Sequence, residues 1–183
     1  GIYTGPTPFD LAPAPGITNP VVTAEHVTDV SAAYVADPFM LRNERGWTLF
    51  FEVMNSVTGK GDIGYATSED GTSWSYGGIA LTEPFPLSYP YVFESDGEFF
   101  MMPETYQTDS IRLYRAVEFP HHWILDRVLI EGQTLVDPSP FRHAGNWWMF
   151  AATGKPPFFA DTLRLFAADS LVGPWCEHPK SPI

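Results

Sequence analysis

Short runs of apolar residues, bounded by polar turns, recur along most of the chain. Three first runs (PFMLR, PYVFE and PSPFR) are each followed by a turn and by a second, more apolar run (WTLFFEV, EFFMMPE and WWMFAAT). A third run (IGYATS, IRLYRA and LRLFAA) follows each second run after a loop. These runs are short and rich in aromatic residues, and no helical periodicity appears, so the pattern predicts β-strands throughout.

The predicted strands belong to a long internal repeat. Its three copies start at Asp37-Pro38, Tyr89-Pro90 and Asp137-Pro138, offset by 52 and then 48 residues, and they stay in register for at least 16 positions. A fourth strand is expected around Gly78 to Leu81 and around Arg127 to Ile130, after a turn that ends in an aligned tryptophan. The aligned tryptophans are Trp74, Trp123 and Trp175.

Four antiparallel strands repeated at this period predict an all-β fold made of β-propeller blades. A β-sandwich is the main alternative, but it gives no reason for aligned Asp/Tyr-Pro and Trp columns. We expect one partial propeller domain over residues 1–183, with blade 1 at 34–84, blade 2 at 85–133 and an incomplete blade 3 at 134–183. Propellers close with about four to eight blades, so the chain is expected to be a fragment of a larger ring.

The N-terminal segment, residues 1–33, precedes the repeat and is expected to help close the ring. Its run TNPVVTAE resembles HPKSPI at the other end of the chain, where the fourth strand of blade 3 should begin. We therefore predict that the N-terminal segment supplies the closing, outermost strand of a last blade.

The repeat also predicts the position of a functional site. The first strand of every blade lines the central axis, so Asp37, Tyr89 and Asp137 are expected at one mouth of the channel. The second strand returns to the same end and brings Glu52 and Glu104 to its rim. Crowded carboxyl groups do not all ionise together near neutrality, which suits general acid and base catalysis on a glycosidic bond.

Structural roles compete with this interpretation. An Asp before Pro commonly caps a turn through its side chain, and a repeated Asp can serve only to join neighbouring blades. Glu104 is expected to face Arg112 across a hairpin, as a simple salt bridge or as a substrate clamp. The candidates for stacking on sugar rings are Tyr34, Tyr89, Tyr91 and the loop pair Phe158-Phe159.

Composition narrows the class of partner. The net charge of -12 would repel nucleic acid and anionic lipid, so a carbohydrate or glycoconjugate is the expected partner, without membrane insertion. No zinc-type spacing occurs, and hydrolysis of a glycosidic bond requires no metal or organic cofactor. The single cysteine, Cys176, and the lack of a recognisable signal peptide or transmembrane segment favour a cytoplasmic location.

Longer motifs give a family resemblance. The runs ADPFMLRNERGWTLFFEV, SEDGTSW and VDPSPFRHAGNWWMFAATG resemble the five-bladed propellers of glycoside hydrolase families 43 and 32. The runs GIYTGPTPF, EVMNSVTGKGDIGYATS, LSYPYVFE and LVDPSPF are more specifically similar to the N-terminal propeller domain of plant glucosamine inositolphosphorylceramide transferase and its bacterial relatives. The resemblance implies a five-bladed ring, of which three blades and a closing strand lie in this chain.

The resemblance to the hydrolases also implies roles for single residues. Asp37 matches their base or nucleophile, and Asp137 matches the Asp that tunes the acid or steadies the transition state. The hydrolases' general acid would fall about four residues after residue 183, so Glu104 is a candidate for a catalytic role only as a substitute. In the transferases, the propeller accompanies a separate glycosyltransferase domain, which implies association with glycans without hydrolysis.

Three functions follow from the sequence. The first is a glycosidase-type propeller, with Asp37, Asp137 and Glu104 as catalytic residues and five further residues binding the substrate. The proposed substrate-binding residues are Glu52, Tyr89, Tyr34, Arg112 and Phe158. The second is a non-catalytic glycan-binding accessory domain associated with a glycosyltransferase or another catalytic domain, and the third is a propeller used only for protein assembly.

Overall fold

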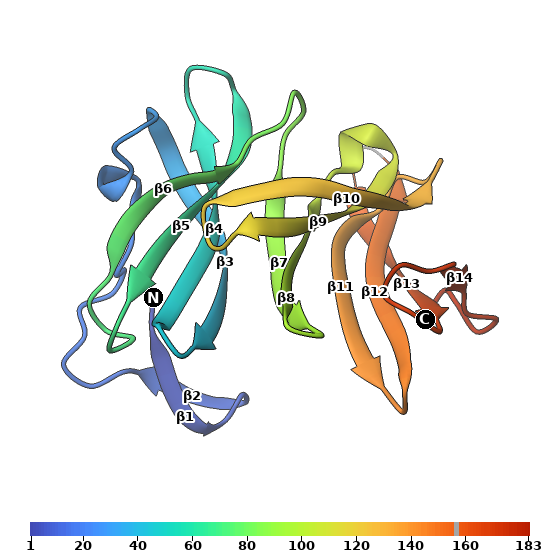
Figure 1. The fold of residues 1–183 in the computed structure, drawn as a ribbon, viewed down its shortest axis with the longest axis horizontal. Coiled ribbons are helices and arrows are strands. Elements are labelled where there is room, and N and C mark those ends of the chain that lie inside the picture. Colours follow the sequence, from blue (N-terminus) through green and yellow to red (C-terminus); the bar gives the residue numbers. More distant parts are fainter. Residues whose placement is uncertain (156–157) are drawn as a thin grey trace.

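Three antiparallel four-stranded sheets follow one another along the chain and lie side by side (Figure 1). The computed structural model describes residues 1–155 and 158–183, and the side chains of residues 154–160 lie outside this description. The first sheet contains β3 (Ala32–Asn43), β4 (Gly46–Asn55), β5 (Lys60–Ser68) and β6 (Ser75–Leu81). The second contains β7 (Ser88–Ser95), β8 (Glu98–Glu104), β9 (Ser110–Glu118) and β10 (His122–Glu131). The third contains β11 (Val136–His143), β12 (Asn146–Lys155), β13 (Phe158–Ala168) and β14 (Cys176–Glu177).

These sheets confirm the predicted strands and the all-β class. Three details differ from the sequence prediction. Strand β10 begins at His122, so Trp123 lies within this strand and not in the turn before it. Strand β3 begins at Ala32, so Asp37 lies in its middle and not at its start. The third sheet has a short fourth strand, β14, because Cys176 pairs with Ala167 and the following His178 N–H donates to the Leu165 carbonyl at 2.8 Å.

Successive side chains of a strand point to opposite sides. The apolar runs of the second strands therefore make both faces of each sheet apolar. In β4, Phe50 points toward the second sheet and Phe51 points away from it. Phe50 is fully buried and meets Trp123 of β10 edge to face, with ring centroids 5.6 Å apart. The second and third sheets share a separate core in which Phe93 packs against Trp147 at 5.7 Å. The aligned aromatic residues therefore pack one sheet against the next, as in a propeller.

The N-terminal segment covers the far face of the first sheet. Val22, Val27 and Val30 pack there with Phe51. Asp29 fastens the segment to β6, since its carboxylate accepts hydrogen bonds from the Tyr76 hydroxyl at 2.6 Å and from the Ile79 N–H at 2.9 Å.

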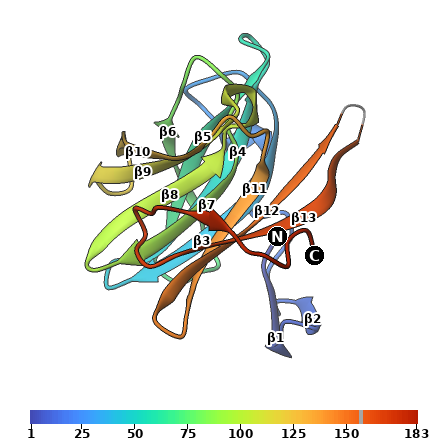
Figure 2. The ribbon, with the colours of Figure 1, turned by 90° about the vertical axis from the view of Figure 1, so that its right-hand side faces the viewer.

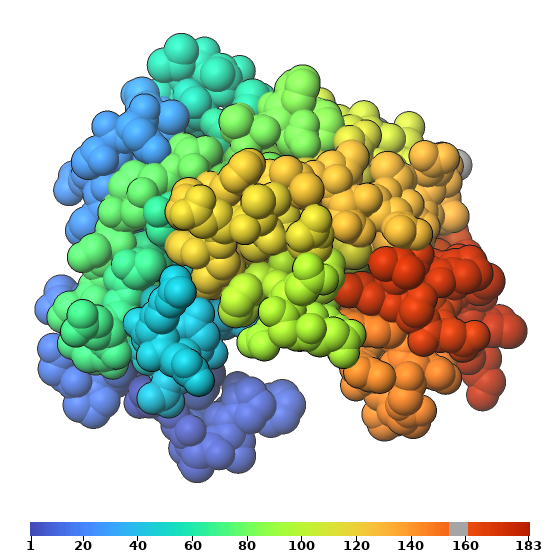
Figure 3. Space-filling view, viewed as in Figure 1, coloured from blue at the N-terminus to red at the C-terminus, as the bar shows by residue number. Residues whose placement is uncertain are grey.

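The segment also contains the 3-10 helix η1 (Ala24–His26) and a hairpin of β1 (Tyr3–Thr7) and β2 (Asp10–Pro13). The hairpin projects beyond the three sheets (Figures 1, 2 and 3). Residues 18–25, which include TNPVVTAE, form no strand here. The closing strand predicted there would need a sheet other than the three described, so it stays a prediction.

A second 3-10 helix, η2 (Tyr106–Thr108), follows β8. In the described part of the chain, no helix is long and apolar enough to cross a membrane.

Candidate functional site

Asp37, Tyr89 and Asp137 occupy the same irregularity in the three first strands. At each of these residues and the proline after it, the pairing with the second strand skips, which is the mark of a β-bulge. Their φ angles are 48°, 46° and 54°, in the left-handed region that residues other than glycine rarely adopt. Left-handed non-glycine residues cost roughly 1–3 kcal/mol each and gather at functional sites, so a strain repeated three times needs a common reason.

The second strands bring carboxylates to the same place, as predicted. Glu52 pairs with Ala36, and Glu104 pairs with Ser88, so each lies opposite the residue before the bulge. In the third sheet this position is Ala152. The rim therefore carries two glutamates, and the third sheet contributes none.

Hydrogen bonds join Asp37 and Glu104 to the sheet that follows each of them. The Tyr89 N–H donates to Oδ2 of Asp37 at 3.3 Å, and the Asp137 N–H donates to Oε2 of Glu104 at 3.3 Å. In both cases the donor is the bulge residue of the following sheet. These bonds fit the structural interpretation of the acids as joints between blades, and they leave other carboxylate lone pairs for a ligand.

Glu104 and Asp137 form a close carboxyl pair. Burial raises the pKa of Glu104 to about 7, and the charge of Asp137 adds to this shift. Burial also raises the pKa of Asp137; a hydrogen bond with Glu104 opposes that rise, and the charge of Asp37 adds to it. Near neutrality, the Glu104 carboxyl is partly protonated and can donate to the Asp137 carboxylate.

Glu52 extends this group on the side of the first sheet. Its side chain is buried, with 8% of the residue exposed, and the Tyr34 hydroxyl donates to its Oε1 at 3.5 Å. Burial raises the pKa of Glu52, and the charge of Asp37 raises it further. Asp37 thus raises the pKa of both Glu52 and Asp137, and Asp137 raises that of Glu104. Electrostatic interactions therefore link all four carboxyl groups of the mouth.

Arg112 is not part of this group. Its Nε donates to Oγ of Ser110 at 3.1 Å, and its guanidinium lies 4.9 Å from the centre of the Phe85 ring. Side chains alternate along β9, and buried Ile111 takes the face toward the third sheet, so Arg112 points to the opposite face. The predicted contact of Arg112 with Glu104 is wrong for this reason.

The predicted aromatic residues have three different outcomes. Tyr34 is 47% exposed, and its hydroxyl contacts Glu52 at the mouth. The Tyr89 ring meets Phe39 edge to face at 4.8 Å, and its hydroxyl lies 2.9 Å from Oγ of Ser139. Tyr89 is therefore engaged in contacts between sheets and not presented for stacking. The Tyr91 ring likewise packs against Phe39 and Phe93. The side chains of Phe158 and Phe159 lie outside the described residues.

Ser139 is a site residue that the sequence reasoning missed. It aligns with Phe39 and Tyr91 in the repeat, so a small polar residue stands in an aromatic column. This departure from the repeat is the sequence feature that could have identified Ser139.

The mouth has no cationic counterpart within the part of the chain that the structure describes. The ion pairs found there are Lys60–Asp62, Arg115–Glu98, Arg115–Asp126, His121–Glu118 and Arg164–Glu177. None of them includes a carboxylate of the mouth. The described residues also contain no group of three or more His, Cys, Asp or Glu side chains arranged to hold a metal ion.

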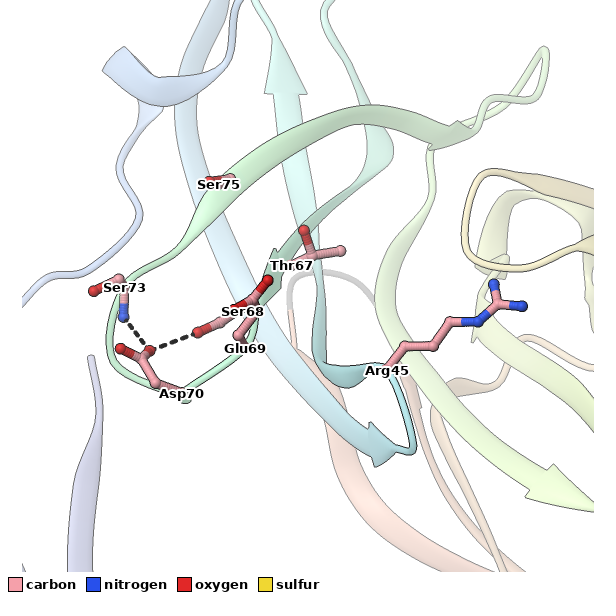
Figure 4. A pocket seen from close by; sticks show the side chains of 7 residues that line it. All are labelled: Arg45, Thr67, Ser68, Glu69, Asp70, Ser73 and Ser75. Carbon is pink, nitrogen blue, oxygen red and sulfur yellow. Dashed lines mark hydrogen bonds between the residues drawn. The ribbon is translucent and has the colours of Figure 1, made fainter.

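A surface hollow of about 570 Å³ lies away from these acids (Figure 4). It is lined by Arg45, Thr67, Ser68, Glu69, Asp70, Ser73 and Ser75. The Asp70 carboxylate accepts hydrogen bonds from the Ser73 N–H at 2.8 Å and from the Ser68 hydroxyl at 3.0 Å. Backbone donors of the turn, with Ser73 first, lower the pKa of Asp70. Asp70 thus organises its own turn, and the hollow contains no predicted site residue.

Comparison with known proteins confirms the resemblance. Residues 1–183 match the family model described as Glucosamine inositolphosphorylceramide transferase 1, N-terminal. The chain is 38% identical over 200 residues to Glucosamine inositolphosphorylceramide transferase 1 of Oryza sativa subsp. japonica, and 36% identical to the Arabidopsis thaliana protein. These alignments cover 100% of this chain but 27% and 26% of the relatives, so the chain spans about a quarter of their length.

Solved structures show the same fold at low identity. An exo-β-1,3-galactanase from Clostridium thermocellum matches with a TM-score of 0.72 and 13% identity, over 86% of this chain and 38% of that chain. Zg3597, a family 117 glycoside hydrolase from Zobellia galactanivorans, matches with a TM-score of 0.62 and 18% identity, over 81% of this chain and 55% of that chain. The three sheets therefore have the propeller fold of these glycoside hydrolases over the aligned part of the chain.

Proposed function

Because the chain belongs to the family of glucosamine inositolphosphorylceramide transferase 1 N-terminal domains, we propose that it is a glycan-binding propeller that accompanies a glycosyltransferase. The observation that supports this function best is the mouth itself, where strained bulges and second strands bring four carboxyl groups together without a cationic partner among the described residues. The curated relatives are named for glucosamine and for inositolphosphorylceramide. We propose the sugar portion of such a glycoconjugate as the ligand.

The chemistry of the mouth suits a sugar ring. Carboxylate oxygens accept hydrogen bonds from sugar hydroxyl groups, and the exposed Tyr34 ring offers an apolar face with a polar edge. The uncompensated negative charge would repel a phosphate group. The ligand's sugar, and not a phosphodiester, is therefore proposed to face the acids.

We propose that the three sheets belong to a five-bladed ring. The solved relatives are longer than this chain, which covers 55% of Zg3597 and 38% of the galactanase. A ring of this kind would bring further side chains to the mouth beside Asp37 and Asp137.

Hydrolysis is the second candidate function, and one observation favours it. The Glu104 carboxyl has a pKa of about 7 and lies beside Asp137, which gives it the protonation required of a general acid near neutrality. In this mechanism Glu104 would protonate the leaving oxygen, Asp37 would act as base or nucleophile, and Asp137 would stabilise developing positive charge.

A glycan panel separates the two functions. The full-length protein would be tested for binding and for released sugar, together with Asp37→Asn and Asp137→Asn, which remove one charge and keep a residue type tolerant of positive φ. We expect each variant to weaken binding about tenfold to a hundredfold, since a hydrogen bond to a charged group contributes about 1.5–3 kcal/mol. Asp96→Asn is the matched control, because Asp96 also has a positive φ of 53° but lies in the exposed β7–β8 turn.

Each outcome has a clear meaning. Binding without sugar release, weakened by both mouth variants and unchanged by Asp96→Asn, supports the accessory function. Sugar release by the wild type that both mouth variants abolish establishes hydrolysis instead. A protein that neither binds nor cleaves any glycan of the panel would refute both.

A further inference from the structure

We propose that Tyr89 and Ser139 form a positioning bridge that holds Asp37 and Asp137 at a fixed separation across the mouth. The inference rests on the proposed glycan site, because the bridge matters only if the two acids act on one ligand. Neither residue is assigned a contact with the sugar.

One end of the bridge is the backbone of Tyr89. Its N–H donates to the Asp37 carboxylate at 3.3 Å, and its ring packs edge to face on Phe39 of the same sheet as Asp37, at 4.8 Å. Tyr89 is thus fixed to the first sheet by a polar and an apolar contact. Its φ of 46° keeps it in the bulge conformation that the two acids share.

The other end of the bridge is the phenol of Tyr89. Its hydroxyl lies 2.9 Å from Oγ of Ser139, and this serine hydroxyl also lies 3.1 Å from the carbonyl oxygen of Asp137. The serine therefore connects the phenol to the bulge of the third sheet. One residue of the second sheet spans the distance from Asp37 to Asp137.

The repeat provides independent support for a special role. Tyr89 is the exception in a column whose other members are Asp37 and Asp137. Ser139 is the exception in a column whose other members are Phe39 and Tyr91. The two departures from the repeat contact each other, so the second sheet replaces a third acid with a hydrogen-bonded bridge.

A double-mutant cycle on the full-length protein tests the bridge. Tyr89→Phe and Ser139→Ala each remove one hydroxyl, and we expect each to weaken glycan binding about fivefold to tenfold, the loss typical of one hydrogen bond. The double variant should lose no more than the larger single loss, because both changes break the same connection. Ser139→Thr retains the hydroxyl and should restore binding, and Tyr91→Phe is the control for removing a phenol two residues away.

The pH dependence of binding distinguishes positioning from general stabilisation. The acidic groups that interact with Asp137 are Glu104 and Asp37, and Glu52 interacts in turn with Asp37. The charge of Asp37 helps to raise the pKa of Asp137. If the acids separate in Ser139→Ala, the acid limb of the binding profile should move to lower pH. A variant that is merely less stable would keep the midpoint of the wild type.

Hydrogen–deuterium exchange separates failure of the bridge from failure of the proposed function. In Ser139→Ala, peptides containing residues 88–91 and 136–140 should exchange faster together. Normal glycan binding, an unchanged pH profile and unchanged exchange in both single variants would overturn the bridge and leave the glycan site intact. If the wild type binds no glycan, the proposed function fails, and the exchange of the two peptides alone decides whether the bridge exists.

Discussion

At the scale of single residues, the two rim glutamates show how one neighbour changes the chemistry of an aligned position. Glu104 pairs with Ser88 across the strands. Its carboxylate accepts hydrogen bonds from the Ser88 hydroxyl and from the Asp137 N–H. Glu52 pairs with Ala36, which offers no side-chain donor, and its contact is the Tyr34 hydroxyl at 3.5 Å. The same column of the repeat thus contains two carboxyl groups in different environments.

Glu104 should make the folded protein less stable as the pH rises toward neutrality. Its pKa is raised from 4.5 to about 7 on folding, so between these values the folded state binds more protons than the unfolded state. Stability from this group is therefore present at pH 4.5 and lost as the pH approaches 7. Urea unfolding from pH 4.5 to 8 should show a shallower decline for Glu104→Gln than for the wild type.

Glu98→Gln is the control for this titration, because Glu98 lies at the other end of β8 in an exposed position. It should keep the slope of the wild type. Equal slopes for Glu104→Gln and the wild type would show that Glu104 is not held protonated by the fold.

At the scale of elements, the three aligned tryptophans share the indole ring but differ in the hydrogen bond that its N–H donates. The Trp123 indole N–H donates to the Pro120 carbonyl at 2.7 Å, and the Trp175 indole N–H donates to the Leu171 carbonyl at 3.0 Å. The buried Nε1 of Trp74 has no hydrogen-bond partner among the described residues. A buried donor without a partner costs about 1–3 kcal/mol, so the first turn is the least satisfied of the three.

Replacing these indoles with phenyl rings should reveal the difference. Trp74→Phe removes an unpaired N–H, whereas Trp175→Phe removes a paired one and leaves the Leu171 carbonyl without its donor. Both rings are partly buried at the margin of a core cluster, which makes them a matched pair. We expect Trp175→Phe to lose about 1–2 kcal/mol more free energy of unfolding than Trp74→Phe, measured by urea titration. Equal losses would mean that Trp74 has a partner such as water.

The strands could be predicted because the residues that specify them are neighbours in the sequence. Part of the site could not be predicted, because it depends on contacts between sheets. Short, aromatic-rich apolar runs and the turn residues between them predicted the strands, and the repeat brought Asp37 and Glu104 to one mouth through the antiparallel return of the second strand. The partner of Arg112 depends on which face of β9 packs against the third sheet, and a one-residue change of register reverses that choice. The contact between Tyr89 and Ser139 joins two sheets, so no pattern within one blade specifies it.

At the scale of the whole molecule, the stack of sheets has one covered end and one open end. The far face of the first sheet is covered by the N-terminal segment. On the far face of the third sheet, Phe141 and Phe150 stack with centroids 5.5 Å apart, and Leu163 is 43% exposed. Large apolar side chains gathered on an open face indicate that another element packs there. In the proposed five-bladed ring, this element is the next sheet.

Phe141→Asp tests that packing when it is compared in two lengths of the protein. Phe141 is 37% exposed in the 183-residue chain and stacks on Phe150, so Phe141→Asp should cost about 1 kcal/mol there from the lost ring contact. In the full-length protein, the next sheet would bury this position, and the same change should cost about 2 kcal/mol or more from lost apolar burial and an unpaired charge. Val57→Asp, at an 82% exposed loop position, should have a small effect in both lengths. Urea unfolding of both lengths measures the difference, and an equally small effect of Phe141→Asp in both would show that no further sheet covers this face.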